Sequence, residues 1–195
     1  MISAQQHLTR FIQTVLLLFF CSYPLASNAN GSAEELRHFE VYEIPDAGLI
    51  VYKPGSPAWN MEVDERRSND AVILSTPNNY YPPASIEIRL DQRFKTHAID
   101  LPEIAERINQ SLREKTDVTS ASEHAFKPVE YGEIDAYQNQ FEINLESKPY
   151  TIRHTVGLMP SGHVITFMAT TPSGMIDAIE PMATKIYANL EEITQ

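Results

Sequence analysis

The chain has almost no residues that could build a covalent or metal-bound framework. Of its 195 residues only Cys21 is a cysteine, and it lies in an apolar segment near the start of the chain. The rest of the chain therefore contains no disulfide and no cysteine-ligated metal. A domain of this length can hold its fold by burial alone. Glycine is also sparse, with seven residues, and neither a Gly-x-Gly-x-x-Gly nor a P-loop pattern occurs.

Basic residues are scarce as well. The chain has 15 Lys and Arg against 26 Asp and Glu, which gives a formal net charge of −11 at pH 7. An acidic surface repels nucleic-acid phosphates and anionic lipid headgroups. We therefore expect no nucleic-acid partner and no electrostatic adsorption to a membrane, and we interpret the scattered acids as a solvated surface.

Patterns typical of catalytic or metal sites are missing too. The histidines after the apolar segment form no His-x-x-x-His or His-Glu-x-x-His arrangement, and no Gly-x-Ser-x-Gly motif occurs. His154 has apolar neighbours on its strand face and is predicted to be a satisfied core histidine. Ser161 lies near His163, but Pro160 before it favours a turn. We predict no catalytic residue, no metal ligand and no cofactor. The histidines considered are His38, His97, His124, His154 and His163.

The clearest positive feature is an export signal. After a short, weakly basic start, residues 11–20 form an apolar core that suits a secretory signal and is too short to span a bilayer. Small residues follow up to Ala29, as signal peptidase requires. We predict a signal peptide over residues 1–29, cleaved after Ala29. The protein is then periplasmic or secreted, with no membrane span once the signal is removed.

Cys21 raises the alternative of a lipid anchor. A lipoprotein signal needs a small residue directly before the modified cysteine. Here the bulky Phe19 and Phe20 precede Cys21. We therefore disfavour lipid anchoring through Cys21 and expect ordinary cleavage.

The rest of the chain reads as a flexible leader, residues 30–37, and a single α+β domain, residues 38–193. Within the domain, alternating apolar and polar residues or short apolar runs predict strands. Residues 86–90 show the clearest amphipathic alternation, and the last two strands form a hairpin around the tight turn 159–162. The expected strands are residues 39–44, 48–53, 59–64, 71–74, 86–90, 125–130, 133–145, 150–158 and 163–170.

Two helices separate and close these strands. The first has Asp100 as its cap, Glu103 completing a capping box, and a buried stripe from Leu101 to Leu112. The second carries a stripe over residues 176–193. Because long hairpins alternate with only two helices, the sequence predicts an α+β fold, an antiparallel sheet sandwich with two main helices.

The sequence also predicts two irregularities. The apolar phase of strand 133–145 changes near residues 138–140, which predicts a bulge or a bend. The last helix is expected to begin with Thr171 as its cap and Pro172 in its first turn. Pro181 lies inside the apolar stripe of this helix and is expected to kink or split it.

This pattern resembles the PsbP-like and DcrB-like superfamily of small α/β/α sandwich domains. The matching features are the Pro-Gly-Ser-Pro-Ala-Trp element at 54–59 and a helix after the strand at 84–90. The closing block also matches, with a hairpin over 150–159 and 161–170 and a helix that ends at 185–190. The resemblance covers residues 38–193 and is one of topology and spacing.

The resemblance implies non-enzymatic work. Members of this superfamily serve as extrinsic subunits of membrane complexes, as envelope proteins and as chaperones of secreted effectors. No catalytic residues exist in the family to carry over to this chain. We therefore expect no enzyme activity, and we expect an envelope protein as the partner.

One loop is a candidate partner-binding surface. Residues 78–83 place Tyr80 and Tyr81 beside two prolines. Tyrosines on a stiffened loop provide contact area at a low entropy cost, as interfaces favour. The alternative is that these tyrosines pack back on the core. Trp59, by contrast, is predicted to belong to the core.

The sequence therefore predicts an exported, non-catalytic binding or accessory protein of the cell envelope. It acts through protein–protein contacts or by a chaperone-like sheltering of an apolar segment. One alternative is a carrier of a small apolar ligand, such as a lipid, between the sheet and the helices. Another is a small metal-dependent hydrolase that uses His97, His124 or His163 with a nearby carboxylate.

Overall fold

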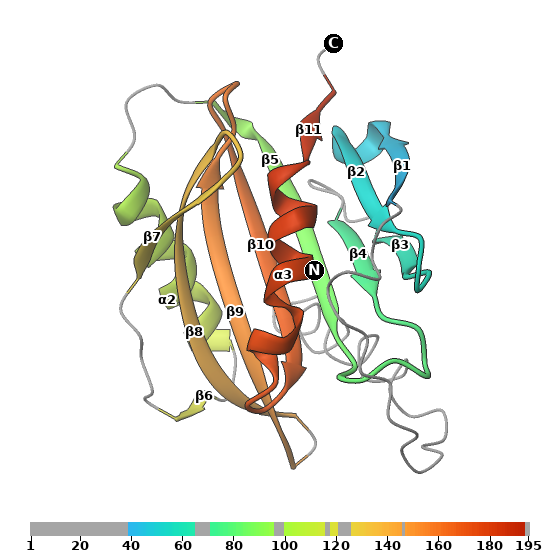
Figure 1. Ribbon diagram of the computed structural model, residues 1–195. Helices are drawn as coiled ribbons and strands as arrows, with labels where there is room; N and C mark the ends of the chain where they lie inside the picture. Colours follow the sequence, from blue (N-terminus) through green and yellow to red (C-terminus); the bar gives the residue numbers. More distant parts are fainter. Residues whose placement is uncertain are drawn as a thin grey trace, which may run out of the picture.

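The structure, a computed structural model (Figure 1), describes residues 39–64, 71–95, 100–115, 118–120, 126–145 and 147–193. Several predictions concern residues outside these ranges. They are the signal peptide with its cleavage site after Ala29, the leader 30–37, and His38, His97 and His124.

The described elements follow the predicted order of strands, helix, strands and helix. The strands are β1 (Phe39–Ile44), β2 (Leu49–Pro54), β3 (Asn60–Asp64), β4 (Ala71–Ser75), β5 (Ser85–Lys95), β6 (Val118–Ser120), β7 (Lys127–Tyr131), β8 (Ile134–Leu145), β9 (Lys148–Leu158), β10 (His163–Pro172) and β11 (Glu191–Glu192). The helices are η2 (Pro45–Ala47), α2 (Leu101–Lys115) and α3 (Ile176–Ala188).

The strands form two sheets. The small sheet has three strands in the order β1-β2-β11, and the large sheet has eight, in the order β3-β4-β5-β10-β9-β8-β6 with β7 also paired to β8. All described pairings are antiparallel. Helix α2 covers one face of the large sheet, and α3 lies with the small sheet on the other (Figure 1). The predicted α+β sandwich with two main helices is confirmed.

The main core lies between the large sheet, α3 and the small sheet. It includes the fully buried side chains of Leu49 on β2, Ile88 on β5, Phe167 on β10 and Ile186 on α3. Tyr187 of α3 stacks on Phe167 with ring centroids 4.1 Å apart. Each element therefore contributes an apolar face to one common layer, which is why the sheets and the helix stay together.

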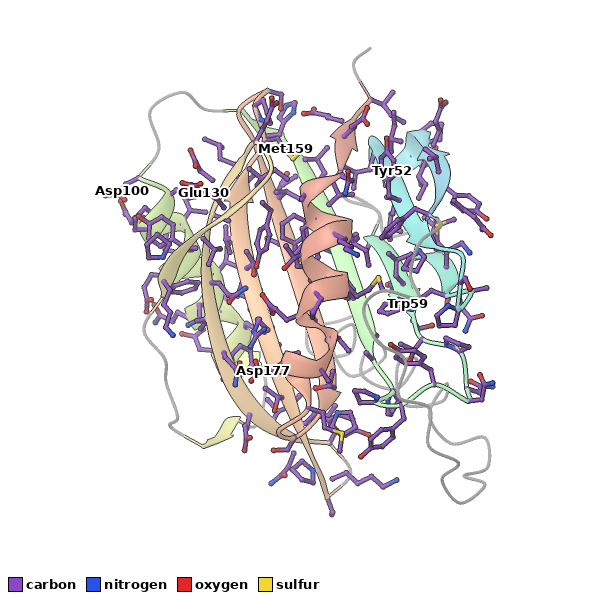
Figure 2. The ribbon with its side chains drawn as sticks, viewed as in Figure 1. Tyr52, Trp59, Asp100, Glu130, Met159 and Asp177 are labelled. Atoms are coloured by element: carbon purple, nitrogen blue, oxygen red, sulfur yellow. The ribbon has the colours of Figure 1, made fainter. Side chains whose placement is uncertain are left out.

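An arginine fixes α3 to the sheet beside this core. Arg153 of β9 pairs with Glu180 and with Asp177, the latter at 2.6 Å, and also donates to Gln140 Oε1 at 2.9 Å. Asp177, which Figure 2 labels, lies in the first turn of α3. The side chain of Arg153 is largely buried. Because a buried guanidinium needs compensating charge and hydrogen bonds, its acidic partners on α3 set the position of the helix.

The opposite face of the sheet has two smaller apolar clusters under α2. Leu101 and Ala105 of the helix pack with Val156 and Val164 of the sheet. Farther along, Leu112 packs against a cluster of strand residues. The predicted stripe on the first helix is therefore confirmed as the face that meets the sheet.

Strand β8 contradicts the predicted bulge at residues 138–140. Its pairing with β9 runs without a register shift from end to end, although the strand curves (Figure 1). Ile134 and Ala136 face the main core, whereas Phe141 and Ile143 face the α2 side. The apolar phase changes because the two halves of one regular strand are covered on opposite faces by different helices.

The start of α3 also differs from the prediction. Thr171 and Pro172 still belong to β10 and pair with β9, and the helix begins only at Ile176. Gly174, with φ of +76°, turns the chain between strand and helix. Pro181 lies inside a helix that runs unbroken to Ala188, so the predicted split does not occur.

Candidate functional site

The loop of residues 76–84 joins β4 to β5 and carries the two predicted partner-binding tyrosines. Its ends are fastened to each other. The Thr76 N–H donates to the Ala84 carbonyl at 3.0 Å, and the Ala84 N–H donates to Thr76 Oγ1 at 2.9 Å. Inside the loop, the Tyr80 N–H donates to the Pro77 carbonyl at 2.9 Å. These bonds hold both the base of the loop and its first turn.

The two tyrosines differ in exposure. Tyr81 is 62% exposed, one of two large hydrophobic residues that are exposed in the described part of the chain. Tyr80 is half buried. Trp59 is 2% exposed and belongs to the main core, as predicted (Figure 2). Tyr81 is therefore the tyrosine that a partner can reach.

This loop lies in an uncharged part of an acidic protein. From Ala71 to Ile86 the sequence contains no Asp, Glu, Lys or Arg, although the chain carries a net charge of −11. A contact made here buries no charged side chain of the segment. Since burying an unpaired charge is costly, the absence of charge favours a contact made by apolar area and hydrogen bonds.

A second cluster lies at the turn between β9 and β10. His163 Nδ1 is 2.5 Å from Glu192 Oε1 and 3.3 Å from Ser161 Oγ. The His163 and Glu192 side chains are mostly buried, at 16% and 13% exposure. The Gly162 N–H donates to the Met159 carbonyl at 2.8 Å, which confirms the predicted tight turn.

The geometry of this cluster does not match a serine–histidine–acid relay. In such a relay the acid holds one imidazole nitrogen and the serine hydroxyl bonds to the other. Here Ser161 and Glu192 both contact Nδ1 of His163. The arrangement instead ties the β9–β10 turn to the C-terminal strand β11.

A third polar group lies beneath α2. His154 is 4% exposed, and its Nδ1 has no hydrogen-bond partner. Burial lowers the pKa of His154 to about 4, so the ring is neutral at pH 7. The predicted core position is confirmed, but Nδ1 is not satisfied as expected. His154 and His163 lie on opposite faces of the large sheet, since His163 contacts the small sheet.

The residue paired with His154 in the sheet is Asn139, which binds the helix above it. Asn139 Nδ2 donates to Asn109 Oδ1 at 2.7 Å, and Asn109 is fully buried. Sequence reasoning missed this contact. The available signal was position, because Asn109 follows Ala105 by four residues and so lies on the buried stripe of α2.

In the ranges that the structure describes, no group of three or more His, Cys, Asp or Glu side chains is placed to hold a metal ion. Within the same ranges, every helix is too short or too polar to cross a membrane.

The fold is similar to that of solved structures. A structure from Bacteroides thetaiotaomicron VPI-5482 matches with a TM-score of 0.51 at 17% identity, over 80% of this chain and 49% of that chain. This chain thus spans about half the length of the Bacteroides protein. At this identity the match establishes a shared fold and says nothing of activity.

Two further structures match less well. One is PA94 of Pseudomonas aeruginosa, described as a protein of unknown function and putative regulator, with 14% identity and a TM-score of 0.47 over 81% of this chain and 99% of that chain. The other is LpqN of Mycobacterium tuberculosis, described as involved in cell envelope biogenesis, with 12% identity and a TM-score of 0.49 over 86% of this chain and 98% of that chain. No protein-family model and no curated protein matches the sequence.

Proposed function

We propose that this chain is an exported, non-catalytic binding or accessory protein of the cell envelope that acts through protein–protein contacts. The observation that carries the proposal is Tyr81, a 62% exposed aromatic residue on a loop whose ends are hydrogen bonded to each other. Export rests on the signal-peptide pattern of residues 1–29.

The loop has the physical properties of a binding surface. A tyrosine offers a large apolar ring and a hydroxyl, and it loses few rotamers when it is buried by a partner. The Thr76–Ala84 bonds mean that little backbone entropy remains to be lost on binding. A partner that covers Tyr81 therefore gains contact area without having to order the loop.

Membership of the PsbP-like and DcrB-like superfamily is part of the same proposal. It is supported by the closing hairpin of β9 and β10 followed by α3, and by the helix α2 that follows the strand at 84–90. Members of that superfamily serve as extrinsic or accessory envelope proteins. Such a role agrees with an uncharged loop, residues 76–84, whose ends are hydrogen bonded to each other and which can contact a partner protein.

The test is crosslinking of the exported protein in cells, followed by mass spectrometry. Wild type is compared with Tyr81→Ala, with Tyr81→Phe, and with Glu106→Ala, which alters an exposed residue of α2. We expect one reproducible envelope partner that is lost with Tyr81→Ala and retained with the other two variants. A partner recovered equally with Tyr81→Ala, or no partner in wild type, would contradict the proposal.

A second candidate function is the carriage of a small apolar ligand beneath α2. The observation that favours it is the unpartnered Nδ1 of His154, which lies between two separate apolar clusters. A ligand with one hydrogen-bonding group could satisfy this nitrogen while its apolar part packs beside it. Native mass spectrometry of protein purified from its own cells tests this candidate. A bound lipid that is lost with His154→Leu would favour it over the first.

A further inference from the structure

Strand β1 is an edge strand in the described part of the chain. It stands at the end of the small sheet and pairs with β2 alone, from Phe39 opposite Pro54 to Ile44 opposite Leu49. In an edge strand, alternate residues direct their N–H and C=O groups away from the sheet. These groups form a ready template for one more strand.

Three of the usual protections of an exposed edge are missing from β1, whose exposed charges are the acidic Glu40 and Glu43. Proteins commonly place lysine, proline or a bulge on such a strand to prevent pairing. The sequence Phe-Glu-Val-Tyr-Glu-Ile contains neither lysine nor proline, and its pairing with β2 shows no register shift. Val41, near the middle of the strand, is 57% exposed. The edge is therefore both open and apolar at its centre.

The small sheet is also acidic. Lys53 is the only basic residue in β1, β2 and β11, and it is buried. It bonds to Glu40 Oε2 at 2.8 Å and to the Trp59 carbonyl at 3.1 Å. Glu43 of β1 is exposed, and no described residue forms an ion pair with it. The edge therefore offers an uncompensated negative charge two residues from Val41, on the same face of the strand.

We propose that β1 is a docking edge for an extended, basic segment of a partner protein. The segment adds as a strand beside β1, with an apolar side chain against Val41 and a Lys or Arg two residues away against Glu43. The backbone bonds supply affinity, and the side chains at alternate positions supply specificity. This surface is distinct from the Tyr81 loop and does not depend on it.

Charge argues against a second copy of this chain as the occupant. Strand β1 of a second copy contains no Lys or Arg, so it cannot supply a positive charge opposite Glu43. A partner strand with Lys or Arg opposite Glu43 supplies that charge.

The test is an amide NMR titration of the purified protein with the capped peptide Thr-Lys-Thr-Val-Thr-Lys-Thr, which presents Lys, Val and Lys on one face of a strand. The capped peptide Thr-Glu-Thr-Val-Thr-Glu-Thr is the control. We expect the basic peptide to shift the amides of β1 most and to slow their hydrogen exchange, with weaker binding as salt is raised. The acidic peptide is expected not to bind.

A matched pair of charge reversals locates the contact. We expect Glu43→Lys to weaken binding of the basic peptide about tenfold, whereas Glu106→Lys, on the exposed face of α2, changes it less than about twofold. An unchanged amide spectrum away from the mutated site checks that each variant is folded. The proposal is overturned if both reversals weaken binding equally or if the largest shifts lie outside β1. It is also overturned if the wild type dimerises through β1 amides without any peptide.

Discussion

Asn109 of α2 and Asn139 of β8 join the helix to the sheet through a buried hydrogen bond of 2.7 Å, in which Asn139 Nδ2 donates to Asn109 Oδ1. The bond lies between the two apolar clusters that α2 makes with the sheet. Apolar packing is tolerant of sliding, whereas an amide pair has one favourable geometry. The pair therefore fixes the position of α2 on the sheet.

Breaking this pair should destabilise the protein. We expect Asn109→Leu to lower the free energy of unfolding by about 1–3 kcal/mol, because Asn139 loses a buried partner. Gln110→Ala, on the exposed side of the same turn, should cost less than about 0.5 kcal/mol. Urea unfolding of the two variants measures both values. Equal losses of unfolding free energy in the two variants would show that the Asn109–Asn139 hydrogen bond adds nothing to stability.

The neutral, buried His154 should make stability depend on pH. In the unfolded chain a histidine binds a proton near pH 6.5, whereas in the folded protein burial lowers the pKa of His154 to about 4. Between these values the unfolded state binds more protons, so stability is lost as the pH falls. This group alone should remove up to about 3 kcal/mol between pH 6.5 and pH 4.

His154→Gln isolates that contribution, since glutamine does not titrate. Urea unfolding of wild type and variant at several pH values between 7 and 4 should show a steeper decline for wild type. Parallel declines of the two proteins would mean that His154 is protonated in the folded state as easily as in water.

The contact between His163 and Glu192 should hold the C-terminal strand in place. Strand β11 has only two residues, and the Ile193 N–H that follows it donates to the Gly48 carbonyl at 3.0 Å. We expect His163→Ala to speed hydrogen exchange of the Ile193 amide by tenfold or more, on the order of 1.4 kcal/mol of local opening. Ser161→Ala removes only the two 3.3 Å contacts of the Ser161 hydroxyl with His163, to Nδ1 and from the backbone N–H, and should change that exchange much less. Unaltered hydrogen exchange of the Ile193 amide in both variants would mean that the contact between His163 and Glu192 does not hold β11 in place.

Two glycines with similar backbone angles should respond differently to alanine. Gly132 has φ of +61°, and a Cβ there would lie 2.7 Å from the Ala188 carbonyl oxygen at the end of α3. Gly174 has φ of +76° and open space around it. Gly174→Ala should therefore cost only the left-handed strain of about 1–2 kcal/mol. Gly132→Ala should cost more, because a backbone atom must move.

Thermal unfolding of the two glycine variants provides the comparison. A Gly132→Ala protein as stable as the Gly174→Ala protein would show that the turn between β7 and β8 can shift away from α3 at little cost.

The sequence predicted a strand or a helix correctly where only one of its faces is buried. Alternation predicted β3, whose Met61 and Val63 pack against the main core, and the apolar stripe of α2 predicted the helix face that meets the sheet. It failed where a strand or helix boundary depends on distant partners. Thr171 and Pro172 look like a helix start, but they pair with β9 and continue β10. Glu87 belongs to the polar side of β5, yet it is buried beside Arg89, at 2.5 Å.

For the candidate site, the sequence indicated the loop but not which tyrosine is available. The exposure of each tyrosine depends on the fold of the whole loop, which leaves Tyr81 exposed and Tyr80 half buried. The sequence likewise showed that Ser161 lies near His163. It did not predict the contact of His163 with Glu192, which lies 29 residues further along the chain.

Composition and periodicity alone thus determined an acidic chain without a cysteine framework and predicted its α+β fold and an export signal, because these properties depend on residue types and local spacing. The tertiary structure alone decided which polar groups are buried, which tyrosine is exposed and which strand forms an open edge. These properties depend on contacts between segments that are distant in the chain, and no local pattern encodes which of two faces of a strand a helix will cover.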